Sequence, residues 1–279
     1  MKPDDFEYVS ALLRERSGLV LSGDKAYLME SRLLPVARRW GMSSLDELAQ
    51  AMRFRGDESL LRDVTEAMTT NESSFFRDIR PFEQFEKVVL PRLMGSRAAT
   101  KRIKIWSAAC SSGQEPYSLA IKMKEMGDAF AGWKGEIMAT DLSEEILEKA
   151  KAGIYSQFEA QRGLPITLLV KYFKQDGDKW QIDESLRAMV QFKKFNLLDN
   201  IAQLGNFDVV FCRNVLIYFD QDTKRQVLDK IANQMAPDGV LYLGGAETVI
   251  GISDRFAPIP NERGLYGLAG ADGKLAEAV

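Results

Sequence analysis

The sequence contains no histidine and only two cysteines, Cys110 and Cys212. Without an imidazole, the chain cannot form a serine–histidine or cysteine–histidine nucleophilic pair or a histidine-ligated zinc site. Two cysteines cannot build a four-cysteine zinc site, and no aspartate cluster suggests magnesium, so we expect no metal. Low cysteine usage is typical of a reduced, cytoplasmic protein. Any chemistry of this chain must therefore proceed without an imidazole base.

Long hydrophobic runs are also missing. No apolar stretch reaches the length of about 18 residues that spans a bilayer, and the N-terminus lacks the apolar core of a signal peptide. The net charge is −3 with acidic and basic residues well mixed, so we expect neither nucleic-acid binding nor membrane insertion. Hydrophobic residues make up 46% of the 279, enough to bury a sizeable core.

The pattern along the chain changes near residue 100. Before it, apolar residues recur at helical spacing, which predicts a helical N-terminal domain over residues 1–80. After it, short apolar strands alternate with helices, which predicts a mostly parallel α/β sheet domain over residues 81–279. Residues from about 153 to 188 interrupt the alternation and contain a candidate hairpin, YFKQDGDKWQID. We interpret them as a small inserted β-subdomain.

Polar side chains follow four of the expected strands. They are Ser111 and Glu115 after the first strand, with Gly113 between them in the turn, Asp141 at the end of the second, Asn196 after the third, and Arg213 and Asn214 after the fourth. Ligands bind at the carboxyl ends of the strands in open parallel sheets. We therefore expect these side chains to face one crevice.

Asp141 and Glu115 narrow the class of ligand. An acid at the end of the second strand can accept hydrogen bonds from ribose hydroxyls; the alternative is an acid that only favours a helix N-terminus. A diphosphate needs a glycine-rich turn, whereas this turn has one glycine and Glu115, which repels phosphate. S-adenosylmethionine has a ribose, an ammonium and a sulfonium but no phosphate. The pair therefore favours methyl transfer over nicotinamide-dependent hydride transfer, with a plain first-turn helix acid as the alternative for Glu115.

Two further stretches carry candidate site residues. In TTNESSFFRD, Asn71, Ser73 and Arg77 can donate hydrogen bonds, and the arginine can clamp a carboxylate. The alternative is a polar linker that its two phenylalanines anchor to a core. In FCRNVLIYFD, Tyr218 follows a buried strand closely enough to touch a reacting centre; the alternative is an ordinary half-buried tyrosine.

With these residues in place, the chain resembles the CheR family of chemotaxis-receptor methyltransferases, which are protein-glutamate O-methyltransferases. The matching stretches are TTNESSFFRD, WSAACSSGQEPYSLA, ATDLSEEILEKAKAGIY, NLLD and FDVVFCRNVLIYFD, in the order of the family. The resemblance covers nearly the whole chain, and the five stretches are specific together rather than singly. The resemblance implies a Rossmann-like S-adenosylmethionine-dependent methyltransferase sheet, an all-helical N-terminal domain and an inserted antiparallel β-subdomain.

The resemblance also implies roles for individual residues. It places the cofactor against Asn71, Ser73, Arg77, Glu115, Asp141, Asn196, Leu197, Arg213 and Asn214. Among these, Asp141 would take the ribose, Glu115 the methionyl end, and Asn196 and Leu197 the adenine. Arg77 and Tyr218 would lie near the transferred methyl group as catalytic residues. Ser73 departs from a common threonine, and GGAETVIG lacks a histidine that some members carry before the match of Glu247.

The implied reaction transfers the methyl group of S-adenosylmethionine to glutamate side chains of chemotaxis receptors. The products are glutamate methyl esters and S-adenosylhomocysteine, and the role is sensory adaptation. A glutamate carboxylate is already ionised at pH 7 and needs no general base, which suits a chain without histidine. The implied partner is the cytoplasmic helical region of the receptors, so we expect a cytoplasmic protein recruited to membrane receptor arrays.

Details of the partner stay open at this point. Lys25, Arg32, Arg38 and Arg39 lie on or near one expected helix and can steer an acidic receptor helix, or can simply form a solvated face. The expected hairpin is short and lacks a glycine-rich loop, which predicts a member that does without a tethering peptide at receptor C-termini. Two other functions remain: a methyltransferase with a different acceptor, and a cofactor-sensing regulatory module without turnover.

Overall fold

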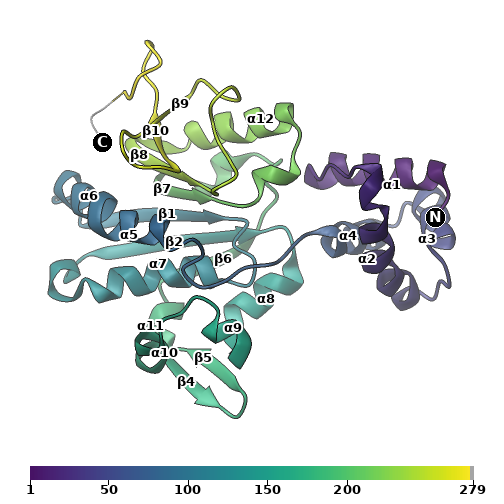
Figure 1. Cartoon of the computed structure of the whole chain (residues 1–279), viewed down its shortest axis with the longest axis horizontal. Coiled ribbons are helices and arrows are strands. Elements are labelled where there is room, and N and C mark those ends of the chain that lie inside the picture. Colours follow the sequence, from purple (N-terminus) through teal and green to yellow (C-terminus); the bar gives the residue numbers. More distant parts are fainter. Residues whose placement is uncertain (277–279) are drawn as a thin grey trace. The chain divides into compact units, whose positions relative to one another are not determined.

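The computed structural model describes residues 1–276 and places them in two compact units. The helical unit comprises Met1–Thr70 together with Tyr218–Thr223. The α/β unit comprises Asn71–Ile217 and the described residues from Lys224 onward. Figure 1 labels α1–α4 of the first unit and most of the helices and strands of the second. None of the helices within residues 1–276 is long and apolar enough to cross a membrane.

Within the helical unit, Met1–Thr70 form four α-helices and one short 3-10 helix. Local sequence sets their ends: Gly18 closes the first helix in a left-handed conformation (φ 75°), and the side chains of Ser44 and Asp57 cap the third and fourth. Their apolar faces pack into one core. The bounds are α1 (Pro3–Ser17), η1 (Gly23–Lys25), α2 (Ala26–Arg39), α3 (Leu45–Arg55) and α4 (Glu58–Met68).

The α/β unit is built on a seven-stranded sheet with the order β6-β2-β1-β7-β8-β10-β9. Strands β6, β2, β1, β7 and β8 are parallel, whereas β10 and β9 are antiparallel at one edge. The expected Rossmann-like sheet is thereby confirmed. The bounds are β1 (Arg102–Ala108), β2 (Lys134–Asp141), β6 (Val190–Lys194), β7 (Phe207–Cys212), β8 (Met235–Leu243), β9 (Phe256–Pro258) and β10 (Leu265–Leu268).

Helices precede the sheet and connect its parallel strands. Before β1 the chain forms α5 (Arg80–Gln84), a π-helical segment η2 (Phe85–Val89) and α6 (Leu90–Ser96). The crossovers contain α7 (Gln114–Glu125), α8 (Glu144–Ala152) and α12 (Gln221–Ala232), whose first residues group with the helical unit. Short 3-10 helices complete the connections: η3 (Gly127–Phe130), η4 (Ile201–Leu204) and η5 (Leu216–Tyr218).

A small antiparallel sheet is inserted between β2 and β6, as the sequence predicts. Its strand order is β3-β5-β4. The pairing is antiparallel throughout, and the β4–β5 pair is the predicted hairpin. The bounds are β3 (Ile154–Ser156), α9 (Gln157–Gln161), α10 (Ile166–Tyr172), β4 (Phe173–Asp176), β5 (Lys179–Ile182) and α11 (Glu184–Arg187).

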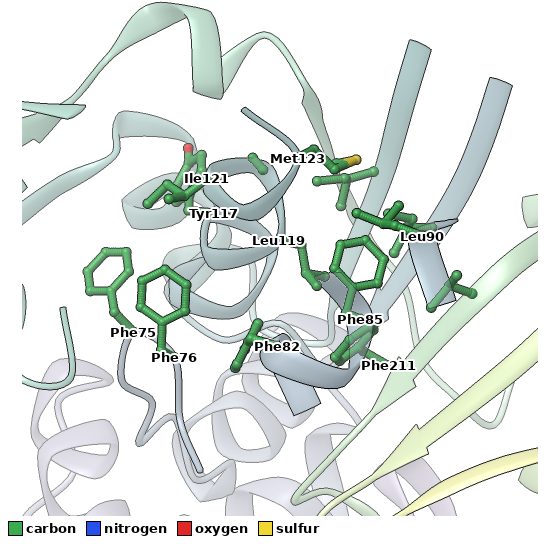
Figure 2. Packing of buried hydrophobic residues seen from close by; sticks show 14 of the residues in the cluster. Phe75, Phe76, Phe82, Phe85, Leu90, Tyr117, Leu119, Ile121, Met123 and Phe211 are labelled. Carbon is green, nitrogen blue, oxygen red and sulfur yellow. The ribbon is translucent and has the colours of Figure 1, made fainter. Parts of the chain in front are cut away.

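The segment between α4 and α5 belongs to the α/β unit, although the sequence analysis set the domain boundary near residue 80. Phe75 and Phe76 are buried, and the Phe75 ring packs edge-on against Tyr155 and Phe173 at 5.0 and 5.5 Å between centroids. Figure 2 shows both phenylalanines beside α7, with Tyr117 on that helix. Burial of this pair in the α/β core explains why the units divide after Thr70.

At Gly163 the inserted subdomain approaches the backbone of this segment closely. Its φ is +88°, and a Cβ atom there would lie 2.0 Å from the Phe75 carbonyl oxygen. We expect Gly163→Ala to lower the free energy of unfolding by about 2 kcal/mol or more, measured by urea denaturation. Gly177 in the β4–β5 turn is the matched control, because its φ is +59° and a Cβ would meet open space. Equal losses in the two variants would contradict the contact.

Candidate active site

The strand order creates a switch point between β1 and β7. The chain continues from β1 to β2 on one side, and β7 lies on the other side of β1. The strand ends are level: Ala108 pairs with Thr140 of β2 and with Cys212 of β7, and Asp141 pairs with Lys194 of β6. Such a point is where open α/β sheets bind ligands. The register thus brings the predicted polar residues to one edge of the sheet.

Asp141 organises the turn after β1. It is buried, and its Oδ2 atom accepts a hydrogen bond from the Ser111 amide (2.8 Å), while Oδ1 accepts one from the Ser143 amide (3.0 Å). The Gly113 amide donates to the Cys110 carbonyl. Two amides of the turn are therefore used inside the protein, which disfavours a phosphate at this helix N-terminus. A carboxylate has about four acceptor positions and can also receive ribose hydroxyls.

Glu115 forms a buried ion pair with Arg213. Its Oε2 atom lies 3.0 Å from Arg213 Nη1, and its Oε1 atom accepts a hydrogen bond from the Ser107 hydroxyl (2.8 Å). Burial raises the pKa of Glu115 above its ordinary value, and the positive charge of Arg213 opposes that rise. The pair joins the first turn of α7 to the end of β7. The sequence placed both residues near the ligand but did not reveal that they bind each other.

Arg213 also holds the segment that precedes α5. Its side chain is 1% exposed, and its Nη2 atom donates to the Arg77 carbonyl (2.9 Å) and to Asp78 Oδ2 (2.7 Å). The guanidinium lies 5.7 Å from the centre of the Phe82 ring. Its Nε atom is buried without a hydrogen-bond partner in the described part of the chain. Arg213 therefore joins α7, the segment before α5 and the end of β7 through its guanidinium group.

The segment with Asn71, Ser73 and Arg77 reaches the same edge. The Asn71 carbonyl accepts a hydrogen bond from the Ser111 hydroxyl (2.8 Å), and Arg77 Nη1 donates to the Glu72 carbonyl (3.1 Å). Asn71, Ser73 and Arg77 are half-buried. The structure thus brings this segment, the turn after β1 and Arg213 together.

Backbone strain gathers in these loops. Non-glycine residues with positive φ occur at Phe76, Asp78 and Ile79 before α5, at Ala109 and Ser111 after β1, and at Asn214 after β7. Such conformations cost about 1–3 kcal/mol each and persist where surrounding contacts enforce them. The contacts include the hydrogen bonds of Asp141 to Ser111, of Arg213 to Asp78, and of Glu247 to the Asn214 amide. This concentration is typical of a functional site.

The remaining predicted contacts lie at the ends of β6 and β7. Asn196 Oδ1 accepts a hydrogen bond from the Leu198 amide (3.0 Å), and Leu197 is buried. Asn214 is half-buried, and its amide donates to Glu247 Oε2 (2.8 Å). The sequence analysis noted Glu247 only as a motif position. Its contact with Asn214 joins residues 33 apart in the sequence, a relation that no local pattern signals.

Tyr218 belongs to the helical unit, whereas the two cysteines belong to the α/β unit. Tyr218 follows the α/β segment that ends at Ile217 and groups with the helical unit, where its carbonyl accepts a hydrogen bond from the Val20 amide (2.9 Å). Its catalytic role remains a prediction. Cys110 and Cys212 are buried, and burial raises the pKa of both thiols well above the ordinary value. Burial therefore disfavours the thiolate, which is the nucleophilic form of cysteine.

The strand ends fit S-adenosylmethionine better than a dinucleotide. Asp141 and Glu115 place two carboxylates at this edge, the groups that ribose hydroxyls and an ammonium would require, and of the Arg213 nitrogens only Nε is buried without a hydrogen-bond partner in the described residues. Two turn amides that a phosphate would need are already satisfied. Within residues 1–276, no group of three or more acidic or cysteine side chains is placed to hold a metal ion. Fold and site together define an S-adenosylmethionine-dependent methyltransferase.

Comparison with known families specifies this class. Residues 71–265 match the model described as the CheR methyltransferase SAM binding domain, and residues 4–69 match the CheR methyltransferase all-alpha domain. The chain belongs to the CheR methyltransferase family. The resemblance inferred from the five motifs is therefore confirmed.

Named relatives agree over most of their length. Chemotaxis protein methyltransferase 1 of Pseudomonas aeruginosa is 42% identical over 94% of this chain and 96% of the relative. Chemotaxis protein methyltransferase Cher2 of Pseudomonas putida is 39% identical over the same shares. A chemotaxis protein methyltransferase of Vibrio anguillarum is 40% identical, again over 94% and 96%.

Proposed function

We propose that this protein methylates glutamate side chains of chemotaxis receptors with S-adenosylmethionine, forming glutamate methyl esters and S-adenosylhomocysteine. The observation that carries the proposal is the family match over both units, 4–69 and 71–265. The relatives' names add the chemotaxis context. The site supports it, because a carboxylate nucleophile needs no base and the chain has no histidine.

The residues divide the work between holding the cofactor and placing the acceptor. Asp141 takes the ribose hydroxyls, Glu115 the ammonium, and Asn196 and Leu197 flank the adenine. S-adenosylmethionine supplies a methyl group activated by its sulfonium. Arg77 and Tyr218 orient the incoming carboxylate and exclude water from it. Arg77 must hold this carboxylate loosely, since tight ground-state binding would not speed transfer.

The proposed partner is the cytoplasmic helical region of the receptors. Lys25, Arg38 and Arg39 are exposed at the ends of α2 and can steer an acidic helix. Arg32 has a different task, because its guanidinium donates to the Met68 and Thr69 carbonyls at the end of α4. We place the protein in the cytoplasm at receptor arrays, without metal and without dependence on a tethering peptide.

The proposal is tested with S-adenosylmethionine labelled on its methyl group and folded receptor fragments from the same organism. We expect label on the receptor that mild alkali releases as methanol. Alkali-stable label would move the acceptor to nitrogen and contradict a glutamate ester. Absence of label, with S-adenosylhomocysteine still bound, would favour the regulatory module.

Replacing Tyr218 with phenylalanine tests the catalytic assignment. We expect kcat for receptor methylation to fall about tenfold while the Kd for S-adenosylhomocysteine stays within about twofold, since the hydroxyl acts on the acceptor. Tyr172→Phe is the matched control: it also removes one hydroxyl, whose partner is Glu125 at the C-terminal end of α7, the end opposite Glu115. If both variants turn over like the wild type, Tyr218 has no catalytic role.

A further inference from the structure

Glu247 gathers four main-chain amides on one carboxylate. Oε2 accepts hydrogen bonds from Gly244 (2.7 Å) and Asn214 (2.8 Å), and Oε1 accepts them from Val215 (2.9 Å) and Ile217 (3.2 Å). Three of the donors belong to the loop after β7. Backbone amides that converge in this way form a concave anion site, here filled by a side chain of the same unit.

The loop after β7 is short and locally strained. Asn214 is left-handed (φ 59°), and only the short helix η5 follows it. Gly244 lets the side chains of Glu247 and Asn214 lie close to its backbone, because a Cβ at this position would lie 2.7 Å from Glu247 Oε2 and 2.8 Å from Asn214 Nδ2. The side-chain amide of Asn214 is therefore packed against Gly244, beside the carboxylate. Glu247, Gly244 and Asn214 form one interlocked contact.

We propose that Glu247 is a positioning residue of the methyl-transfer site. By fixing the amides of residues 214, 215 and 217, it sets the direction of the Asn214 side chain and the start of the chain that leads to Tyr218. This inference rests on the proposed function, in which Asn214 contacts the cofactor and Tyr218 the acceptor. Glu247 itself need touch neither.

The charge and the length of the side chain are both required. A glutamine at this position keeps the length but presents one NH2 group where donors converge, so two amides lose their acceptor. An amide that loses its acceptor gains by turning toward water, so the loop moves. An aspartate keeps the charge but is one methylene shorter, so it can serve only part of the set. We therefore expect E247Q to be the more damaging variant and E247D to be intermediate.

The test combines amide hydrogen exchange with binding and turnover. In E247Q, the peptide covering 213–218 should exchange faster, while a peptide covering β1 keeps its wild-type rate. The Kd for S-adenosylhomocysteine should rise about tenfold, and kcat for methylation of the receptor fragment should fall about 10- to 100-fold. E262Q is the matched control, since Glu262 accepts a hydrogen bond from one side chain, Gln84, and we expect no change in either quantity.

Each outcome decides the inference. Faster exchange with unchanged Kd and kcat would overturn it, because the loop would then be held but irrelevant to the reaction. Unchanged exchange would overturn it as well. If E247Q does not fold, hydrogen exchange of the wild type tests the inference instead. Rapid exchange of the amides at 214, 215 and 217 would show that Glu247 does not hold them. Failure of the wild type to bind S-adenosylhomocysteine and to methylate receptors would instead overturn the proposed function, and with it the positioning role.

Discussion

Replacing Asp141 with asparagine is expected to weaken the binding of S-adenosylhomocysteine at least about 100-fold. The carboxylate would accept the two ribose hydroxyls, and hydrogen bonds to a charged group contribute about 1.5–3 kcal/mol each. In the wild type the Ser111 and Ser143 amides each donate to an oxygen of the carboxylate; asparagine would turn an NH2 group toward one of these amides. Titration calorimetry measures the affinity.

A truncated ligand shows which part of S-adenosylhomocysteine each carboxylate binds. Methylthioadenosine carries the ribose but no amino acid, so D141N should weaken both ligands by similar factors. E115Q should weaken only S-adenosylhomocysteine, because its ammonium is the group that Glu115 would face. Asp183→Asn is the matched control, since Asp183 also accepts an amide, from Ser185, in the inserted subdomain. Wild-type affinity in D141N would refute the ribose assignment.

Replacing Arg213 with methionine is expected to cost about 3–5 kcal/mol in the free energy of unfolding of the α/β unit. The substitution strands the buried Glu115 charge and leaves Asp78 and the Arg77 carbonyl without their donor. Urea denaturation followed by tryptophan fluorescence measures the loss. Arg102→Met is the matched control, because its pair with Glu136 (2.6 Å) is partly exposed and should change stability by less than about 1 kcal/mol.

The pH dependence of this deficit has a definite sign. Burial already raises the pKa of Glu115 in the folded protein, and loss of Arg213 raises it further. A folded state that binds the proton more tightly than the unfolded state gains stability as the pH falls through this pKa. The deficit of R213M should therefore be smaller at pH 5 than at pH 8, and R213M/E115Q should recover part of it. Equal losses in R213M and R102M would contradict the buried pair.

Much of the fold followed from local patterns. Helical spacing before residue 100 and alternating strands and helices after it predict two regions, and the interruption near 153–188 predicts the inserted sheet. The domain boundary after Thr70 was harder to predict from the sequence, because Asn71 and its neighbours are polar. What assigns this segment to the α/β unit is the burial of Phe75 and Phe76 among residues distant in the sequence.

By itself, the sequence determined the class of chemistry and the position of Asp141 and Glu115, because a missing imidazole and residues next to strand ends are local facts. The tertiary structure alone decided which groups meet. Arg213 pairs with Glu115 across 98 residues, and Glu247 holds amides of a loop more than 30 residues away. Strand order brings these segments together, and strand order is set by packing of whole elements rather than by the periodicity within any one of them.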